Sequence, residues 1–201
     1  MLRLGFAPCA KQFLFLGEIM LLISALIIIG VVVFDQATKW IVMLNMEIGD
    51  SIPFIKDIFH FTYIRNPGAS FGSFSESRWV FMVASTVMIA AMLFYLIKYR
   101  PTQKLIYIPA SMIIGGGIGN MIDRLFYGEG FGNGTVVDFL DFCAFPDLWY
   151  WIFNVADAFV CVGAAILFVY LFIDIIKDEK KKKQAESEIQ SESHPENQSE
   201  N

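Results

Sequence analysis

The sequence has few of the residues that build transition-metal sites. It contains 3 cysteines and 2 histidines among its 201 residues, and Cys9, Cys143 and Cys161 have no paired spacing. Zinc sites use Cys and His ligands at short, regular spacings. This inventory therefore predicts no structural or catalytic metal and no cofactor, although carboxylates alone could hold a hard cation.

Charge is also scarce, and apolar residues are abundant. Charged residues make up 17% of the chain and hydrophobic residues 56%, with 20 phenylalanines and a mean hydropathy of +0.54. This composition excludes an ordinary soluble domain and indicates residence in a membrane. The net charge of −5 comes largely from an acidic C-terminal stretch, and we expect no nucleic-acid partner.

The apolar residues gather in four segments long enough to cross a membrane as helices, which takes about 20 residues each. The first follows positive charge, as a signal peptide does. However, it is longer than a typical signal-peptide core, and DQATKW follows it in place of a small-residue cleavage site. We therefore expect four retained helices in one integral membrane domain over residues 1–176, at about 12–36, 79–97, 105–122 and 149–175.

The placement of Lys and Arg predicts the orientation. Basic residues precede the first segment, fill the link at 98–104 and follow the fourth segment at 177–183. The positive-inside rule then puts both termini in the cytoplasm and the two longer loops on the outer face. Residues 177–201 are basic and then acidic, with few apolar residues towards the end, and are predicted to be a disordered cytoplasmic tail.

The two outer loops contain strand-like patterns. SIPFIKDIFHFTYIRN, at 51–66, alternates in places and predicts one or two strands that form a small β element on the membrane surface. TVVDFLDF, at 135–142, contains two carboxylates in an apolar run. In a strand, alternation puts Asp138 and Asp141 on opposite faces, so they are poor partners for each other.

Costly polar residues converge where the predicted helices meet the outer face. Ionisable groups inside a membrane are functional candidates by default, although Glu18 lies near the cytoplasmic end and is expected to reach the interface. Two segments share an Asn-x-x-Asp pattern that puts a carboxamide one helical turn from a carboxylate. The converging residues are Asp35, Gln36, Lys39, Asn120, Asp123, Arg124, Asn154 and Asp157.

Several of these residues also have purely structural interpretations. Asp35 and Lys39 are spaced i,i+4 and predict an ion pair. Asp123 is compatible with an ion pair or a hydrogen bond at a helix end. Asn66 and Gly68, in RNPGASF, predict a turn that is either a plain loop or a binding edge.

Asp138 and Asp157 are the carboxylates that we expect to work together. Asp138 lies in the strand-like run just outside the membrane, and Asp157 lies a few residues inside the fourth segment; neither has an adjacent cation in sequence. Two close carboxylates share a proton, so the ionised acid can accept a proton from water while the other polarises a carbonyl or protonates a leaving amine.

Five sequence blocks resemble the bacterial lipoprotein signal peptidases, also called signal peptidase II. The blocks occur in the family's order and on the expected helix ends: DQATKW, RNPGASFG, GNMIDR, VVDF and FNVADAFVCVG. The resemblance implies an α-helical membrane aspartyl endopeptidase with four transmembrane helices and a small extramembrane β cradle on the outer face. It carries the catalytic role to Asp138 and Asp157, and supporting roles to Asp35, Lys39, Asn66, Gly68, Asn120, Asp123, Arg124, Asn154 and Ala156.

The resemblance also implies the partners and the location. The substrates would be diacylglyceryl-modified prolipoproteins, cut just before the lipidated cysteine, and globomycin-type inhibitors would bind the carboxylate pair. The protein would lie in the bacterial cytoplasmic (inner) membrane, surrounded by membrane lipid, with its active site at the outer face. Two alternatives use the same residues: a small proton- or ion-coupled carrier, which would place them near the bilayer midplane, and a non-enzymatic assembly subunit.

Overall fold

Four long helices and a small sheet make up the protein in a computed structural model, which describes residues 7–67, 78–144 and 151–193. The helices are α1 (Ala7–Asn45), α2 (Arg78–Tyr99), α3 (Lys104–Phe126) and α4 (Val155–Ser193). The strands are β1 (Ser51–Ile55), β2 (Phe59–Asn66), β3 (Val136–Phe142) and β4 (Ile152–Phe153). Each helix contains a stretch apolar enough to cross a membrane, which confirms the predicted fold class.

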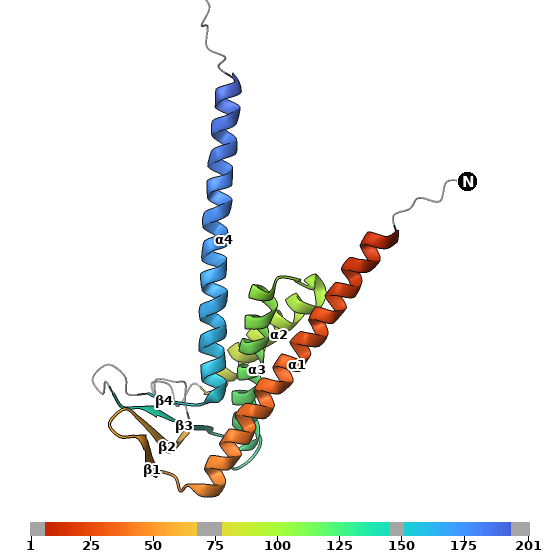
Figure 1. Cartoon of the computed structure of the whole chain (residues 1–201). Helices are drawn as coiled ribbons and strands as arrows, with labels where there is room; N and C mark the ends of the chain where they lie inside the picture. Colours follow the sequence, from red (N-terminus) through yellow and green to blue (C-terminus); the bar gives the residue numbers. More distant parts are fainter. Residues whose placement is uncertain (1–6, 68–77, 145–150, 194–201) are drawn as a thin grey trace, which may run out of the picture.

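The sheet lies at one end of the helices, beside the end of α1 and the start of α4 (Figure 1). Its strands run in the order β1-β2-β3-β4, and every neighbouring pair is antiparallel. Val137 and Phe139 of β3 pack with Val42 of α1 and Tyr63 of β2 in a buried cluster. This packing fixes the sheet against the helices, so the β element predicted in the first outer loop is joined by strands from the second.

α3 is the central helix, and it packs against α1, α2 and α4. Its glycines allow this close approach, as the glycine-rich sequence suggests. A Cβ at Gly115 would lie 2.8 Å from Val31 Cβ, and a Cβ at Gly119 would lie 2.6 Å from Asp35 Oδ2. The approach at Gly119 brings a carboxylate of α1 directly onto the backbone of α3.

The outward faces of the helices are apolar, while the contacts between them include charged groups. Leu22, Leu26 and Val33 of α1 are each about 60% exposed, as expected for side chains that face lipid. In contrast, Asp35 and Lys39 of the same helix are 0% exposed. Such burial of ionisable groups within a membrane helix is unusual enough to mark a functional region.

Two predicted helix ends are wrong for the same electrostatic reason. The first helix continues to Asn45 and the third to Phe126, whereas they were predicted to end near 36 and 122. Considered alone, the charges of Asp35, Lys39 and Asp123 indicate that the chain leaves the membrane. Because Lys39 pairs with both carboxylates in the interior, both helices can continue past these charges.

The fourth helix differs from prediction at both ends. It begins at Val155, after β4, rather than at 149, so Asp157 is its third residue instead of lying several residues deep. It continues to Ser193, so residues 177–193 of the predicted disordered tail are helical. The strong helix formers in DEKKKKQAESE, with Asp178 and Glu179 each four residues before a lysine, account for this extension.

Candidate active site

Lys39 is the buried cation around which the site is built. Its Nζ lies 2.8 Å from Asp35 Oδ2 and 2.9 Å from Asp123 Oδ2, and it donates a hydrogen bond to Asn120 Oδ1 at 3.1 Å. These three acceptors match the three protons of an ammonium group. A buried charge is tolerated when it is paired and fully hydrogen-bonded in this way. The predicted pair of Asp35 with Lys39 is confirmed, and the ion pair that Asp123 forms is with Lys39.

Asp35 and Asp123 each also accept a hydrogen bond from the backbone beside a candidate catalytic acid. Asp35 Oδ1 accepts a hydrogen bond from the backbone N–H of Ala156 at 2.9 Å, immediately before Asp157. Asp123 Oδ2 accepts one from the backbone N–H of Val137 at 3.0 Å, immediately before Asp138. The cluster around Lys39 therefore ties the start of α4 and the start of β3 to the same point.

The start of α4 is a reciprocal cap formed by FNVAD. The Asp157 N–H donates to Asn154 Oδ1 at 2.9 Å, and the Asn154 N–H donates to Asp157 Oδ2 at 3.2 Å. This pairing satisfies two backbone donors at the helix end, as a capping box does. It also holds the Asp157 carboxylate in the first turn, where the helix dipole favours negative charge.

The side-chain amides of the two Asn-x-x-Asp segments donate outside their own segments. The spacing allows each carboxamide to donate to the carboxylate of its own segment, but Asn120 Nδ2 donates to Asp157 Oδ1 at 2.7 Å. Nδ2 of Asn154 instead donates to Asp138 Oδ1 at 2.7 Å. The spacing is correct, but the close packing of α3 on α4 redirects the donors between segments.

Asn154 consequently connects Asp138 with Asp157. Its side-chain amide binds Asp138, while its backbone N–H binds Asp157. The second oxygen of Asp138 accepts a hydrogen bond from Asn66 Nδ2 at 2.9 Å. The structure thus brings together the two carboxylates that the sequence predicts to be partners, one from β3 and one from α4.

Asp138 is poised to change its protonation state near neutral pH. Burial, with 2% of the residue exposed, and the charge of Asp157 raise the pKa of Asp138 to about 7. The hydrogen bonds from Asn66 and Asn154, and the charge of Lys39, act in the opposite direction. A carboxyl group with such a pKa can both hold and release a proton under physiological conditions.

Asp157 lines a cavity of about 220 Å³ between α2, α3 and α4. Its polar lining also includes Asn120 and Arg124, and the guanidinium of Arg124 donates to the Asn120 carbonyl at 3.2 Å. The rest of the lining is mainly apolar, with Met88, Ile89, Met92, Ile113 and Val160. A molecule that occupies this mainly apolar cavity would therefore contact Asp157 directly.

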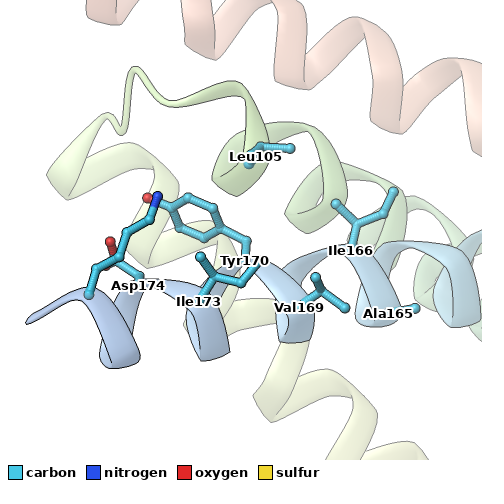
Figure 2. A pocket seen from close by; sticks show the side chains of 8 residues that line it. Leu105, Ala165, Ile166, Val169, Tyr170, Ile173 and Asp174 are labelled. Atoms are coloured by element: carbon cyan, nitrogen blue, oxygen red, sulfur yellow. The ribbon is translucent and has the colours of Figure 1, made fainter. Parts of the chain in front are cut away.

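A second cavity, of about 510 Å³, lies at the opposite end of α3. Figure 2 shows Ile166, Val169 and Tyr170 of α4 lining it together with Leu105 of α3. Leu105 is 15 residues before Asn120, which corresponds to roughly 22 Å along a helix. Although this cavity is larger, neither candidate acid lines it, so it is not the reactive site.

The remaining residues singled out from the sequence are Ala156, Gly68, Glu18 and Asp141. Ala156 is 0% exposed and takes part through its backbone, while Gly68 lies outside the described residues. Glu18 is exposed and pairs with Arg100 at 3.9 Å, in keeping with its expected minor role. Asp141 lies on the other side of the strand and accepts a hydrogen bond from Thr62.

Two polar contacts of the site were not predicted from the sequence. Gln36 Nε2 donates to Asp123 Oδ1 at 2.8 Å, and the Tyr127 hydroxyl donates to Gln36 Oε1 at 2.9 Å. Gln36 was noted among the converging polar groups but was assigned no role. Tyr127 follows the predicted end of the third helix, and nothing in its local pattern distinguishes it from an ordinary interfacial aromatic residue.

Four helices long enough to span a membrane, and two carboxylates bridged by Asn154 at the junction with a small sheet, are features that suit a membrane aspartic peptidase. Residues 27–173 match the family model described as Signal peptidase (SPase) II. The chain therefore belongs to the signal peptidase II family, as its sequence blocks predict, and it is a multi-pass bacterial membrane protein.

Individual relatives agree with this assignment. The chain is 40% identical over 147 residues to the lipoprotein signal peptidase of Halothermothrix orenii, an alignment that covers 73% of this chain and 93% of the relative. It is 41% identical over 140 residues to the lipoprotein signal peptidase of Bacillus pumilus, covering 70% and 86%. A solved structure described as a bacterial membrane enzyme matches with a TM-score of 0.67 and 33% identity, covering 76% of this chain and 88% of that one.

Proposed function

We propose that Asp138 and Asp157 are the catalytic pair with which this aspartic peptidase cleaves prolipoproteins. The observation that carries the proposal is the bridge through Asn154, which binds both carboxylates. It is supported by the pKa of about 7 for Asp138, caused by burial and by the charge of Asp157. A pair that shares one proton near neutral pH contains both the base and the acid that peptide hydrolysis needs.

The reaction follows from this shared proton. With one carboxylate ionised, that group accepts a proton from a water molecule, which attacks the carbonyl carbon of the scissile bond. The protonated partner first stabilises the carbonyl oxygen and then provides the proton for the leaving amine. Lys39 is a positioning residue, since its partners Asp35 and Asp123 hold the backbone beside each acid.

The substrates are prolipoproteins that carry a diacylglyceryl group on the cysteine that becomes the new N-terminus. The cavity beside Asp157 supports this proposal, because its mainly apolar wall suits a lipidated or membrane-embedded segment. Membrane lipid would fill the apolar groove at the other end of α3. Globomycin-type inhibitors are expected to compete with substrate at the carboxylate pair.

The orientation that suits this function has both termini in the cytoplasm and the carboxylates at the outer face. The distribution of basic residues supports it, including Lys98, Arg100 and Lys104 in the link between α2 and α3. The polar groups contact one another beside the sheet, and the sheet lies at one end of the helices (Figure 1). This placement also favours surface-accessible chemistry over a carrier. A reporter that is active only outside the cytoplasm should be inactive when fused to the C-terminus. Activity of that fusion would contradict this orientation.

Cleavage by the purified protein in detergent tests the proposal. We expect wild-type protein to release the signal peptide from a diacylglyceryl-modified prolipoprotein, with mass spectrometry placing the cut immediately before the lipidated cysteine. The unlipidated precursor is the matched substrate control and should be cut far more slowly. The proposal fails if wild-type protein does not cleave, or if both Asp138→Asn and Asp157→Asn still do.

A further inference from the structure

Three potential metal ligands meet on the sheet, on the face of β3 opposite to Asp138. One ligand atom from each of His60, Asp141 and Cys143 lies within 4.8 Å of the others. His60 and Asp141 are direct cross-strand partners, so their side chains lie on the same face. Cys143 follows Asp141 by two residues and continues the pairing through a hydrogen bond from its N–H to the Ile58 carbonyl, which keeps its side chain on that face.

A chain of hydroxyl groups determines which nitrogen of His60 carries the proton. Thr62 donates its only hydroxyl proton to Asp141 Oδ2 at 2.7 Å. The 2.8 Å contact between Ser51 and Thr62 must then be donated by Ser51. Since that proton is also used, the 3.5 Å contact between His60 Nδ1 and Ser51 Oγ requires Nδ1 as the donor. Neutral His60 therefore presents Nε2 as an unprotonated lone pair.

This lone pair has no hydrogen-bond donor. His60 Nε2 is buried and has no partner among the described residues. A buried polar atom without a partner is costly. The Asp141 carboxylate and the Cys143 thiol lie beside this imidazole. Once the thiol loses its proton, the three side chains offer one nitrogen, one oxygen and one sulfur donor.

We propose that His60, Asp141 and Cys143 bind a zinc ion at the surface of the sheet. This mixture of imidazole, carboxylate and thiolate suits Zn²⁺, with a water molecule in the fourth position. The hydrogen bonds from Thr62 and Ser51 orient the carboxylate and the imidazole, as outer partners of metal ligands commonly do. The ion joins β2 to β3 and thereby steadies the strand that carries Asp138.

The sequence inventory did not predict this site because its ligands have no local spacing. His60 lies in the first outer loop, whereas Asp141 and Cys143 lie in the second. Only the register of β2 against β3 brings them together. The site also gives a role to Asp141, the second carboxylate of TVVDFLDF, which the peptidase reaction does not use.

Zinc binding would displace the thiol proton into solvent. Because each bound ion releases that proton, zinc affinity should increase as the pH is raised. The exposed thiol of Cys161 in α4 has no comparable partners among the described metal-ligating groups and provides a matched control.

Metal analysis of the full-length protein tests the proposal. The protein is purified in detergent without a polyhistidine tag, stripped with EDTA, dialysed against micromolar Zn²⁺ and analysed by mass spectrometry for metals. We expect about one zinc per chain for wild type and for Cys161→Ser, and none for His60→Asn or Cys143→Ser. Thr62→Val should retain the ligands but bind about 10–100-fold more weakly.

Cobalt substitution gives a second measurement, and its decisive result comes from the wild-type protein alone. Wild-type protein loaded with Co²⁺ should show a thiolate-to-cobalt charge-transfer absorption that is lost in Cys143→Ser. The proposal is overturned if wild type lacks this absorption. It is equally overturned if the His60 and Cys143 variants retain as much zinc as wild type, which would mean adventitious binding only.

Discussion

Removing the Lys39 ammonium should destabilise the protein strongly, because it leaves two carboxylates buried without a counter-charge. Asp35 and Asp123 are both 0% exposed, and each lies within 3 Å of Lys39 Nζ, at 2.8 Å and 2.9 Å. Lys39→Met keeps the length of the side chain but changes the net charge of the cluster from about −1 to about −2. Breaking a buried pair by removing one partner costs about 3–5 kcal/mol.

This cost should be visible as a fall in melting temperature. For a chain of 150–250 residues, 1 kcal/mol corresponds to about 2–4 °C, so Lys39→Met should melt roughly 6–20 °C below wild type. The measurement is thermal unfolding in detergent, followed by intrinsic fluorescence. Lys56→Met, at an exposed position in the turn before β2, is the control and should change stability by less than about 0.5 kcal/mol.

A triple variant separates charge from shape. Lys39→Met combined with Asp35→Asn and Asp123→Asn removes all three charges but keeps a carbonyl oxygen to accept the backbone hydrogen bonds of Ala156 and Val137. It should recover much of the lost stability, because a neutral cluster avoids the unpaired buried charge. The reasoning is refuted if Lys39→Met costs no more than Lys56→Met, or if the triple variant is less stable than Lys39→Met alone.

Two further predictions concern the pH profile and the helix packing. Asp138, with its pKa raised to about 7, keeps its proton below that pH and loses it above, so activity should fall as the pH rises through about 7. Asn66→Ala removes a hydrogen bond that lowers this pKa, so the alkaline limb should move to higher pH; an unmoved or lower limb would contradict the role of Asn66. Gly119→Ala places a Cβ 2.6 Å from Asp35 Oδ2 and should cost about 1–3 kcal/mol in thermal unfolding. Gly30→Ala meets nothing within 4 Å and should be neutral or stabilising, so equal effects of the two alanines would refute the packing argument.

The membrane architecture could be predicted from the sequence because hydropathy reports it directly. Spans of about 20 apolar residues and the alternation in FHFTYIRN and VVDFLDF correspond to the observed helices and strands. Helix ends were predicted less well. Asp35 and Asp123 look like exit points when each charge is considered alone, and only their shared contact with Lys39 explains why the helices continue.

The meeting of Asp138 and Asp157 could be anticipated from topology, but the hydrogen bonds through which Asn154 connects them could not. A three-residue spacing shows that a carboxamide and a carboxylate share a helix face. It does not show which neighbouring helix or strand lies opposite. The hydrogen bond from Asn120 to Asp157 depends on how closely α3 approaches α4, and the one from Asn154 to Asp138 depends on where β3 lies; both are set by tertiary packing.

The central claim is that Asp138 and Asp157 act as one unit, and kcat for the two single variants and the double variant tests it most directly. We predict that Asp138→Asn and Asp157→Asn each reduce kcat for lipidated prolipoprotein by about 10⁴-fold or more, and that the double variant is no slower than the worse single variant, because groups that act together are not additive. Glu129→Gln, an exposed control in the same outer loop, should retain wild-type kcat. The account is contradicted if either single variant remains within tenfold of wild type, or if the two losses multiply in the double variant.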